Sequence, residues 1–115
     1  MKKNENTLIQ VNQFGMGQGN DELGLKLIGN YFKILVEDNH LPRFIAFYNS
    51  GVKIICKGSP IIEVLKTIES MGVKLLACKT CLDFYELTDK IEVGVAGTMH
   101  DIVLLQANAD KVITL

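Results

Sequence analysis

The sequence predicts a single α/β domain built on a mostly parallel five-stranded sheet with helices on both faces, a three-layer sandwich. Short apolar runs alternate along the chain with longer windows at helical spacing, and no hairpin signal such as Asn-Gly joins two strands. The composition is 48% hydrophobic but only 7% aromatic, as expected where aliphatic strands are covered on both faces. With 115 residues, we expect one domain over residues 7–115 after a polar tail at residues 1–6.

The first part of the chain predicts a strand, a loop and a helix. Residues 7–12 form the first expected strand, and the glycines of residues 15–20 indicate a loop. Apolar side chains then recur at helical spacing over residues 21–38. Asn20 or Asp21 would cap this helix, and acidic side chains suit the positive end of its dipole.

The middle of the chain predicts a strand, a short turn and a second helix. We expect the strand over residues 44–48, followed by a break at Asn-Ser-Gly and a short helical turn over residues 52–56. The next helix would begin with Ser59 as its cap and Pro60 in the first helical position. Gly72 would end it.

The last part of the chain continues the alternation. Residues 73–77 predict a buried strand, and residues 81–87 a short helix. A fourth strand at residues 93–96, a helix at residues 98–108 and a closing strand at residues 111–115 complete the expected sheet. The sequence contains no internal repeat, low-complexity segment or linker.

Charge and hydropathy exclude several classes of partner. The net charge of −1 gives no electrostatic case for nucleic acid or for an anionic membrane surface. No apolar stretch approaches the roughly 20 residues of a membrane span, and no signal-type segment follows the polar start. We therefore expect a cytoplasmic protein, whose three cysteines are mostly kept reduced.

Cys78 and Cys81 are the strongest chemical signal. They follow the third expected strand, and α/β sheets bind and react at the carboxyl ends of their strands. We thus expect Cys78 at the working edge of the sheet and not lost in the core. Lys79 and a helix start near Thr80 would favour the reactive thiolate form. The alternative is two half-buried cysteines that only fill space beside a strand.

The two thiols do not match a thioredoxin or a zinc site. Their spacing permits a redox disulfide, but the Trp-Cys-Gly-Pro-Cys sequence of thioredoxins is missing. A single pair lacks the other half of a zinc site, and His40 and His100 show no ligand spacing to it. The sequence therefore predicts no metal. Cys56 has no evident partner and is expected to be a core or subsurface thiol.

Two weaker signals concern a glycine-rich loop and a histidine. Gly15, Gly17 and Gly19 occupy the position where a dinucleotide-binding fold holds a pyrophosphate, but their spacing differs from that motif and the acidic side chains that follow would repel a phosphate. A capping loop that lines a pocket near the thiols is the favoured interpretation. His100, which follows Thr98 closely and precedes an aspartate, suggests a general base, but an exposed or capping role is favoured.

Four segments carry a resemblance to a known family: residues 20–24, 47–53, 58–60 and 78–85. Together they look like the DsrE/DsrF-like superfamily, with the closest likeness to the carboxy-terminal domain of YedF-type proteins, which are described as sulfurtransferase-like and linked to selenium metabolism. The likeness covers nearly the whole chain. It implies a five-stranded parallel α/β sandwich that assembles into a trimer or hexamer, with a dimer as the alternative.

The resemblance also implies a chemistry. In the sulfur-relay members a cysteine just after a central strand carries a persulfide between partner proteins, and Cys78 matches it by position. Cys81 belongs to the YedF-type pattern. We expect Cys78 to accept sulfane sulfur (or selenium) from a donor protein and pass it to an acceptor, with TusA-like proteins among the partners. Cys81 would resolve the persulfide, leaving a Cys78–Cys81 disulfide.

This interpretation requires no metal or organic cofactor. Residues at the same edge are expected to support the thiols or line their pocket: Lys79, Thr80, Gly15, Gly17, Gly19, Asn49, Ser50, Thr98 and His100. Two alternatives stay open. One is a non-enzymatic oligomeric binding module whose cysteines only line a pocket. The other is a dithiol redox switch that forms a reversible disulfide without transferring sulfur.

Overall fold

A five-stranded sheet, parallel throughout, lies at the centre of the computed structural model, which describes residues 5–115. The strands are β1 (Glu5–Val11), β2 (Pro42–Phe47), β3 (Lys74–Cys78), β4 (Val95–Gly97) and β5 (Lys111–Thr114). Their spatial order is β4-β3-β2-β1-β5. The chain thus starts inside the sheet, moves outward to β4 and returns across it to add β5 beside β1. The predicted fold class is confirmed.

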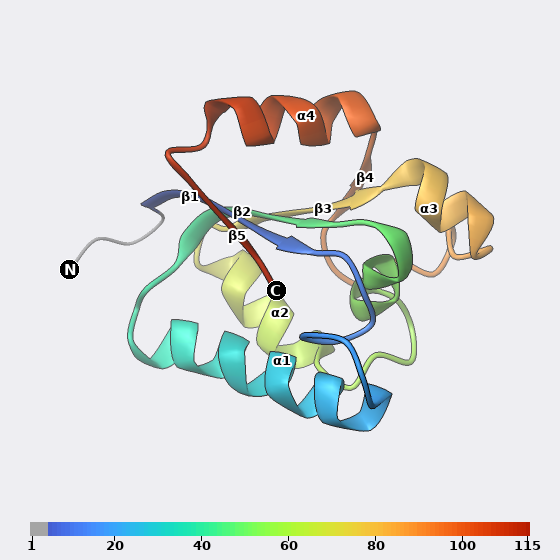
Figure 1. Ribbon diagram of the computed structural model, residues 1–115, viewed down its shortest axis with the longest axis horizontal. Helices are drawn as coiled ribbons and strands as arrows, with labels where there is room; N and C mark the ends of the chain where they lie inside the picture. The colour runs from blue at the N-terminus through green and yellow to red at the C-terminus, as the bar shows by residue number, and fades with distance from the viewer. Residues whose placement is uncertain (1–4) are drawn as a thin grey trace.

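The helices form a layer on each face of this sheet, as Figure 1 shows. Helices α1 (Asp21–Glu37) and α2 (Ile62–Ser70) cover one face, and α4 (Met99–Asn108) covers the other. Parallel crossovers are right-handed, so a connection that runs back across the sheet places its helix on the opposite face. The reversal of strand order between β4 and β5 therefore explains why α4 is separated from α1 and α2.

Two short helices lie beyond the carboxyl ends of the strands. The 3₁₀ helix η1 (Asn49–Ile55) follows β2, and α3 (Lys79–Phe84) follows β3 directly. Because β2 and β3 are neighbours in the sheet, η1 and α3 come together at the same edge. The short helical turn expected after the second strand is confirmed, and it begins at Asn49, earlier than predicted.

Several boundaries differ from the predictions. Strand β1 begins at Glu5, so the last two residues assigned to the polar tail belong to the sheet, and residues 1–4 lie outside the described residues. Helix α2 begins at Ile62, because Ser59 and the proline after it form a turn in which the Ser59 Oγ accepts a hydrogen bond from the Ile61 N–H at 3.4 Å. Helix α3 begins at Lys79, two residues early.

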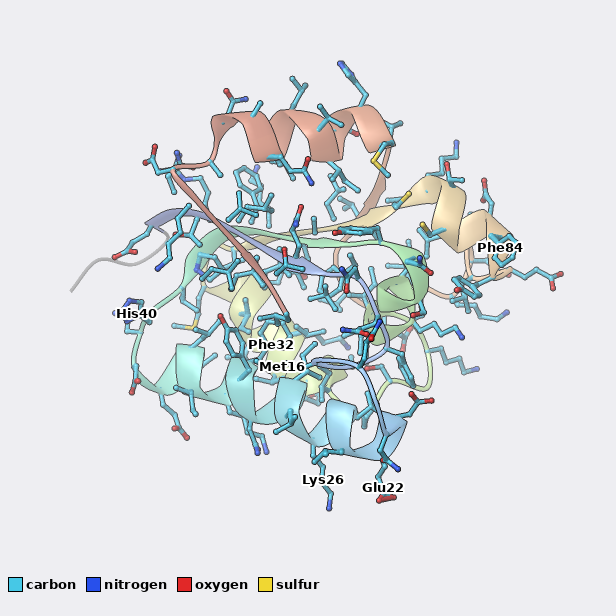
Figure 2. The ribbon with its side chains drawn as sticks, in the orientation of Figure 1. Met16, Glu22, Lys26, Phe32, His40 and Phe84 are labelled. Atoms are coloured by element: carbon cyan, nitrogen blue, oxygen red, sulfur yellow. The ribbon has the colours of Figure 1, made fainter. Side chains whose placement is uncertain are left out.

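The core fills the space between the sheet and its helices. Its largest fully buried side chains come from β1, β2, β3, α1, α2, η1 and the residue before β2: Phe32, Phe47, Leu8, Ile9, Ile28, Leu41, Ile45, Ile54, Ile55, Leu65, Ile68 and Leu75. Figure 2 shows Phe32 projecting from α1 toward the sheet. Helix α4 contributes less, since Ile102 is its one buried residue within residues 5–115.

Local contacts fix the segments that carry the site. The Asn20 Oδ1 accepts a hydrogen bond from the Leu23 N–H at 2.9 Å and caps α1, as predicted. Gly51 packs so closely on the end of β1 that a β-carbon there would overlap the carbonyl oxygen of Val11. The same oxygen accepts the Tyr48 N–H at 3.0 Å. Helix η1 is therefore held against the sheet, and Asn49 with it.

Helix α4 begins with a capping box. Thr98 Oγ1 accepts the Asp101 N–H at 3.2 Å, and the Asp101 carboxylate accepts the Thr98 N–H at 2.9 Å. Hydrogen bonding to the carboxylate, first from the Thr98 backbone N–H and then from the Thr98 side chain, lowers the pKa of the Asp101 carboxyl. Thr98 therefore has a structural role at the start of α4.

Candidate functional site

Cys78 and Cys81 meet at the carboxyl end of β3. Cys78 is the last residue of this strand and the cap residue of α3, and Cys81 lies one turn into the helix. Side chains at these two positions of a helix lie next to each other, as they do in a capping box. The two cysteines, both free, are therefore neighbours across the first turn of α3. Sequence spacing and the strand-to-helix junction together build the dithiol.

The two thiols differ sharply in exposure. Cys78 is 1% exposed and belongs to the hydrophobic core, whereas Cys81 is only partly buried. The expectation that Cys78 would lie outside the core is therefore wrong. Strand β3 lies between β2 and β4, and Cys78 itself pairs with Gly97 of β4, so neighbours enclose it even at the end of the strand.

A backbone donor from a neighbouring element contacts the more exposed thiol. The Asn49 N–H, at the start of η1, donates a hydrogen bond to the Cys81 Sγ at 3.1 Å. Asn49 has a φ of 52°, in the left-handed region that asparagine tolerates better than most residues. Its Oδ1 accepts hydrogen bonds from the Ser50 N–H at 2.9 Å and from the Tyr85 hydroxyl at 3.4 Å. These contacts hold the Asn49 N–H toward the Cys81 Sγ.

A pocket of about 370 Å³ opens at the Cys81 thiol. Its lining comes from the ends of three elements and the segments beside them: Tyr48, Asn49, Thr80, Cys81, Phe84, Tyr85 and Met99. Most of these side chains are apolar or aromatic. Phe84 is 80% exposed, and Figure 2 shows it at the far end of α3, projecting into solvent. The pocket therefore offers an apolar surface beside a reachable thiol.

The surroundings of Cys81 have opposing effects on its ionisation. Burial raises the pKa of the Cys81 thiol most, and the neighbouring Cys78 raises it further, while the Asn49 N–H lowers it. The net effect is a raised pKa. A thiolate on Cys81 is thus costly near neutral pH, and Asn49 is the group that partly offsets this cost.

The glycine-rich loop forms a pocket of its own. Gly17 and Gly19 line a space of about 320 Å³ together with Ser50 and Lys53, and neither thiol is part of its lining. Gly15 instead packs on α1, where a β-carbon would lie 2.7 Å from the carbonyl carbon of Gly24. The expected capping loop is present, but it does not line the thiol pocket.

Of the remaining predicted residues, Thr80 lines the thiol pocket and the others do not. Lys79 is exposed at the start of α3. Neither Thr98 nor His100 is among the residues that line this pocket, where Met99 takes the place expected for them. The histidine is exposed on the first turn of α4.

Sequence reasoning missed the aromatic and basic residues around the thiols. The Lys53 Nζ lies 4.5 Å from the centre of the Tyr85 ring, a cation–π contact that joins η1 to the end of α3. Phe84 and Tyr85 pack edge to face, with ring centres 5.2 Å apart. The run of Phe-Tyr directly after the second cysteine was the one available signal, because one helical turn brings these rings back beside Cys81.

The described residues hold neither a metal-binding cluster nor a membrane-spanning helix. Across residues 5–115, no group of three or more His, Cys, Asp or Glu side chains is arranged to hold a metal ion. No helix in the same range has the length and apolar character needed to cross a membrane. The third cysteine, Cys56, is buried and donates its S–H to the Val52 carbonyl at 3.2 Å, as expected of a core thiol.

The fold and this site define a small parallel α/β domain with a dithiol at the carboxyl edge of its sheet. The family model described as the DsrE/DsrF-like family matches residues 10–115. The chain therefore belongs to the DsrE/DsrF-like family, as the sequence resemblance predicted. A search of curated proteins finds no match.

Solved structures share the fold. The chain resembles the YchN protein of E. coli with a TM-score of 0.72 and 22% identity, over 100% of both chains. It resembles MTH1491 of Methanobacterium thermoautotrophicum, a protein of unknown function, with a TM-score of 0.71 and 19% identity over 95% of this chain and 97% of the other. BT1422 of Bacteroides thetaiotaomicron, also of unknown function, gives 0.69 and 12% identity over 96% and 95%.

Proposed function

We propose that this protein is a sulfur carrier that uses the Cys78–Cys81 pair. The observation that carries the proposal is a pair of neighbouring cysteines at the start of α3, of which Cys81 lines a pocket and receives a backbone N–H on its sulfur. Membership of a family associated with sulfur relay supports the same chemistry. The activity is sulfurtransferase-like, since the protein takes sulfur from one partner and gives it to another.

The transfer is a thiol exchange at sulfur. A cysteine thiolate of the pair attacks the outer sulfur of a donor persulfide, forming a cysteine persulfide and releasing the donor as a thiolate. An acceptor thiolate then attacks the outer sulfur of that persulfide and restores the cysteine thiolate. No electrons are gained or lost overall, so neither step needs a metal or an organic cofactor. Selenium in place of the transferred sulfur would follow the same route.

The partners are a donor and an acceptor protein, with TusA-like proteins as candidates for either, and further copies of this chain. Helix α4 and the adjacent strands expose large apolar side chains: Val95, Met99, Val103, Leu104 and Val112. Such a face on a small domain favours contact with another protein. We propose that a second copy covers it in a trimer or hexamer, or in a dimer.

Mass spectrometry tests the proposed function. The reduced protein is incubated with a persulfide donor, and its intact mass and peptide map are recorded. A gain of one sulfur, roughly 32 Da, on one cysteine of the pair is expected. The variant in which Cys78 and Cys81 are both serine should gain none, and Cys56→Ser should behave as the wild type. Equal loading of the double variant would contradict the proposal.

The closeness of the two thiols also favours a second candidate, a dithiol redox switch. In that case the pair would lose two hydrogens on mild oxidation, regain them with a dithiol reductant, and never gain sulfur from the donor. No change of mass under either treatment would favour the binding module, in which the cysteines only line the pocket.

A further inference from the structure

We propose that Cys81 is the thiol that receives the sulfur and that Cys78 is the thiol that resolves it. This inference rests on the proposed function and assigns the order of the two thiols within it. It reverses the order expected from the sequence, in which Cys78 was loaded and Cys81 resolved. Three features of the site carry it: the access to each thiol, the Asn49 N–H that donates to Cys81, and the place of Cys78 beside Cys81 in the core.

Access separates the two thiols. In a sulfur transfer, the attacking sulfur, the transferred sulfur and the leaving sulfur approach along one line, with bonds of about 2 Å between them. A donor persulfide must therefore come within bonding distance of the attacking atom. Cys78 is 1% exposed, so a donor persulfide cannot reach its sulfur in this structure. Cys81 lines the open pocket and meets it directly.

The Asn49 N–H favours Cys81 at both stages of the transfer. A hydrogen-bond donor 3.1 Å from the sulfur stabilises negative charge on that atom. Negative charge resides there before the thiolate attacks the donor. It returns there when Cys81 is the leaving group during delivery to the acceptor. Asn49 is thus a positioning residue for Cys81, held by its own bonds to Ser50 and Tyr85.

Cys78 lies where a resolving thiol is needed. It is the neighbour of Cys81 across the first turn of α3, it belongs to the hydrophobic core, and it is not among the residues that line the pocket. When Cys81 holds a persulfide, the Cys78 thiolate can attack the Cys81 Sγ and break the bond to the outer sulfur. A Cys78–Cys81 disulfide forms and hydrosulfide leaves. The two cysteines are oxidised by two electrons, the sulfane sulfur is reduced to sulfide, and a dithiol reductant restores the pair.

This arrangement makes the outcome depend on the acceptor. An acceptor thiolate that enters the pocket first takes the outer sulfur, and the pair stays reduced. Without an acceptor, Cys78 discharges the sulfur as sulfide. The buried thiol therefore limits how long the protein carries an undelivered sulfur.

Single-cysteine variants test the order. Wild type, Cys78→Ser, Cys81→Ser and the control Cys56→Ser are reduced, mixed with inorganic polysulfide, quenched by alkylation and mapped. Cys78→Ser should gain roughly 32 Da on Cys81 and keep it. Cys81→Ser should load more slowly by at least about tenfold. Wild type and Cys56→Ser should release sulfide and form the Cys78–Cys81 disulfide.

The outcomes that overturn the order differ from those that overturn the function. If Cys81→Ser loads on Cys78 as fast as the wild type loads, the order is wrong and sulfur carriage stands. If no protein gains sulfur or releases sulfide, although each loads after denaturation, the proposed function itself fails.

A pulse of iodoacetamide on the folded wild type gives a test free of substitutions in the core. Cys81 should be alkylated at least about tenfold faster than Cys78, because only Cys81 lines the pocket. Faster labelling of Cys78 would overturn the order even if the Cys78 variant did not fold. Circular dichroism of each variant shows which loading results come from folded protein.

Discussion

At the scale of single residues, the site is defined by unequal thiols. Cys78 and Cys81 are three positions apart on one strand-to-helix junction, yet one belongs to the core and the other lines a pocket. Exposure and the Asn49 N–H distinguish them, and neither feature comes from the cysteines themselves. Two predictions follow from the groups that act on Cys81.

The first prediction concerns pH. Burial and Cys78 raise the pKa of the Cys81 thiol above its ordinary value of 9.0, so at any lower pH less of it is thiolate than in a free cysteine. The loading rate should therefore still be rising as the pH passes 9.0. Cys78→Ala removes one cause of the raised pKa and should move the profile toward lower pH. Loading rates measured across neutral and alkaline pH check this.

The matched control for the pH profile is Cys56→Ala, which also removes a buried thiol, but one that bonds to Val52 and is not among the residues that line the thiol pocket. Its profile should coincide with that of the wild type. A Cys78→Ala profile that does not move, or that moves to higher pH, would contradict the influence assigned to Cys78.

The second prediction concerns Asn49. Asn49→Gly keeps the N–H and tolerates the φ of 52°, but it loses the side-chain bonds to Ser50 and Tyr85, so the pH profile of loading should move to higher pH by less than in a variant that cannot adopt this φ. Asn49→Val places a β-branched side chain in a left-handed conformation, at a cost of about 1–2 kcal/mol. The backbone should turn away from that conformation and withdraw the N–H from Cys81. The loading profile should then move to higher pH.

A titration of the Cys81 thiolate by ultraviolet absorbance, with the other two cysteines replaced by alanine, reads out the Asn49 effect directly. A purely structural role for Asn49 would lower the melting temperature of the valine variant without moving this titration. That result would contradict the assignment of Asn49 as a positioning residue.

At the scale of elements, the site depends on how closely η1 approaches β1. Gly51 makes this approach possible, because a β-carbon there would overlap the Val11 carbonyl. Asn49 precedes Gly51 by two residues. The contact of Gly51 with Val11 therefore also sets the position of the Asn49 N–H that donates to Cys81. A single glycine thereby couples strand packing to the chemistry of the thiol.

The third prediction tests this coupling. Gly51→Ala should lower the free energy of unfolding by about 1–3 kcal/mol through overpacking. It should also slow loading, since η1 must shift away from β1. Gly58→Ala is the comparison at a glycine with open space around it but a φ of 98°. Its effect should be confined to stability, and thermal melts with loading rates distinguish the two. Unchanged loading in Gly51→Ala would separate the strand contact from the site.

At the scale of the whole molecule, the two faces of the sheet are unequally covered. Two helices lie on one face, while α4 alone lies on the other among residues 5–115, as Figure 1 shows. Helix α4 buries Ile102 and leaves Val103 about half exposed. The apolar side chains left on this face are those proposed to contact a second copy.

The fourth prediction is that Val103→Glu disrupts this assembly, because a charged side chain opposes burial in an apolar contact. Sedimentation should show the wild type as an oligomer and the variant as a monomer, with unchanged circular dichroism. Leu27→Glu places the same charge at an exposed leucine of α1, on the other face, and should leave the oligomer intact. A monomeric wild type, or dissociation by Leu27→Glu alone, would contradict the proposed face.

The sequence alone determined the fold class, the family and the segment that carries the thiols. The alternation of strands and helices predicted the parallel α/β sheet, because apolar periodicity records which face each element buries. The motif around Cys78 and Cys81 predicted the family now matched over residues 10–115. Helix starts with a side-chain cap, such as Asn20, could also be predicted, since a cap acts within a few residues of the chain.

Only the tertiary structure decided which thiol is accessible and what surrounds it. The burial of Cys78 depends on β2 and β4 lying on either side of β3, and this strand order has no local signature in the sequence. The Asn49 N–H reaches Cys81 across 32 residues of chain, and Met99 joins the pocket from another helix, α4. Such contacts arise when separate elements pack together, so a periodic pattern within one element cannot encode them.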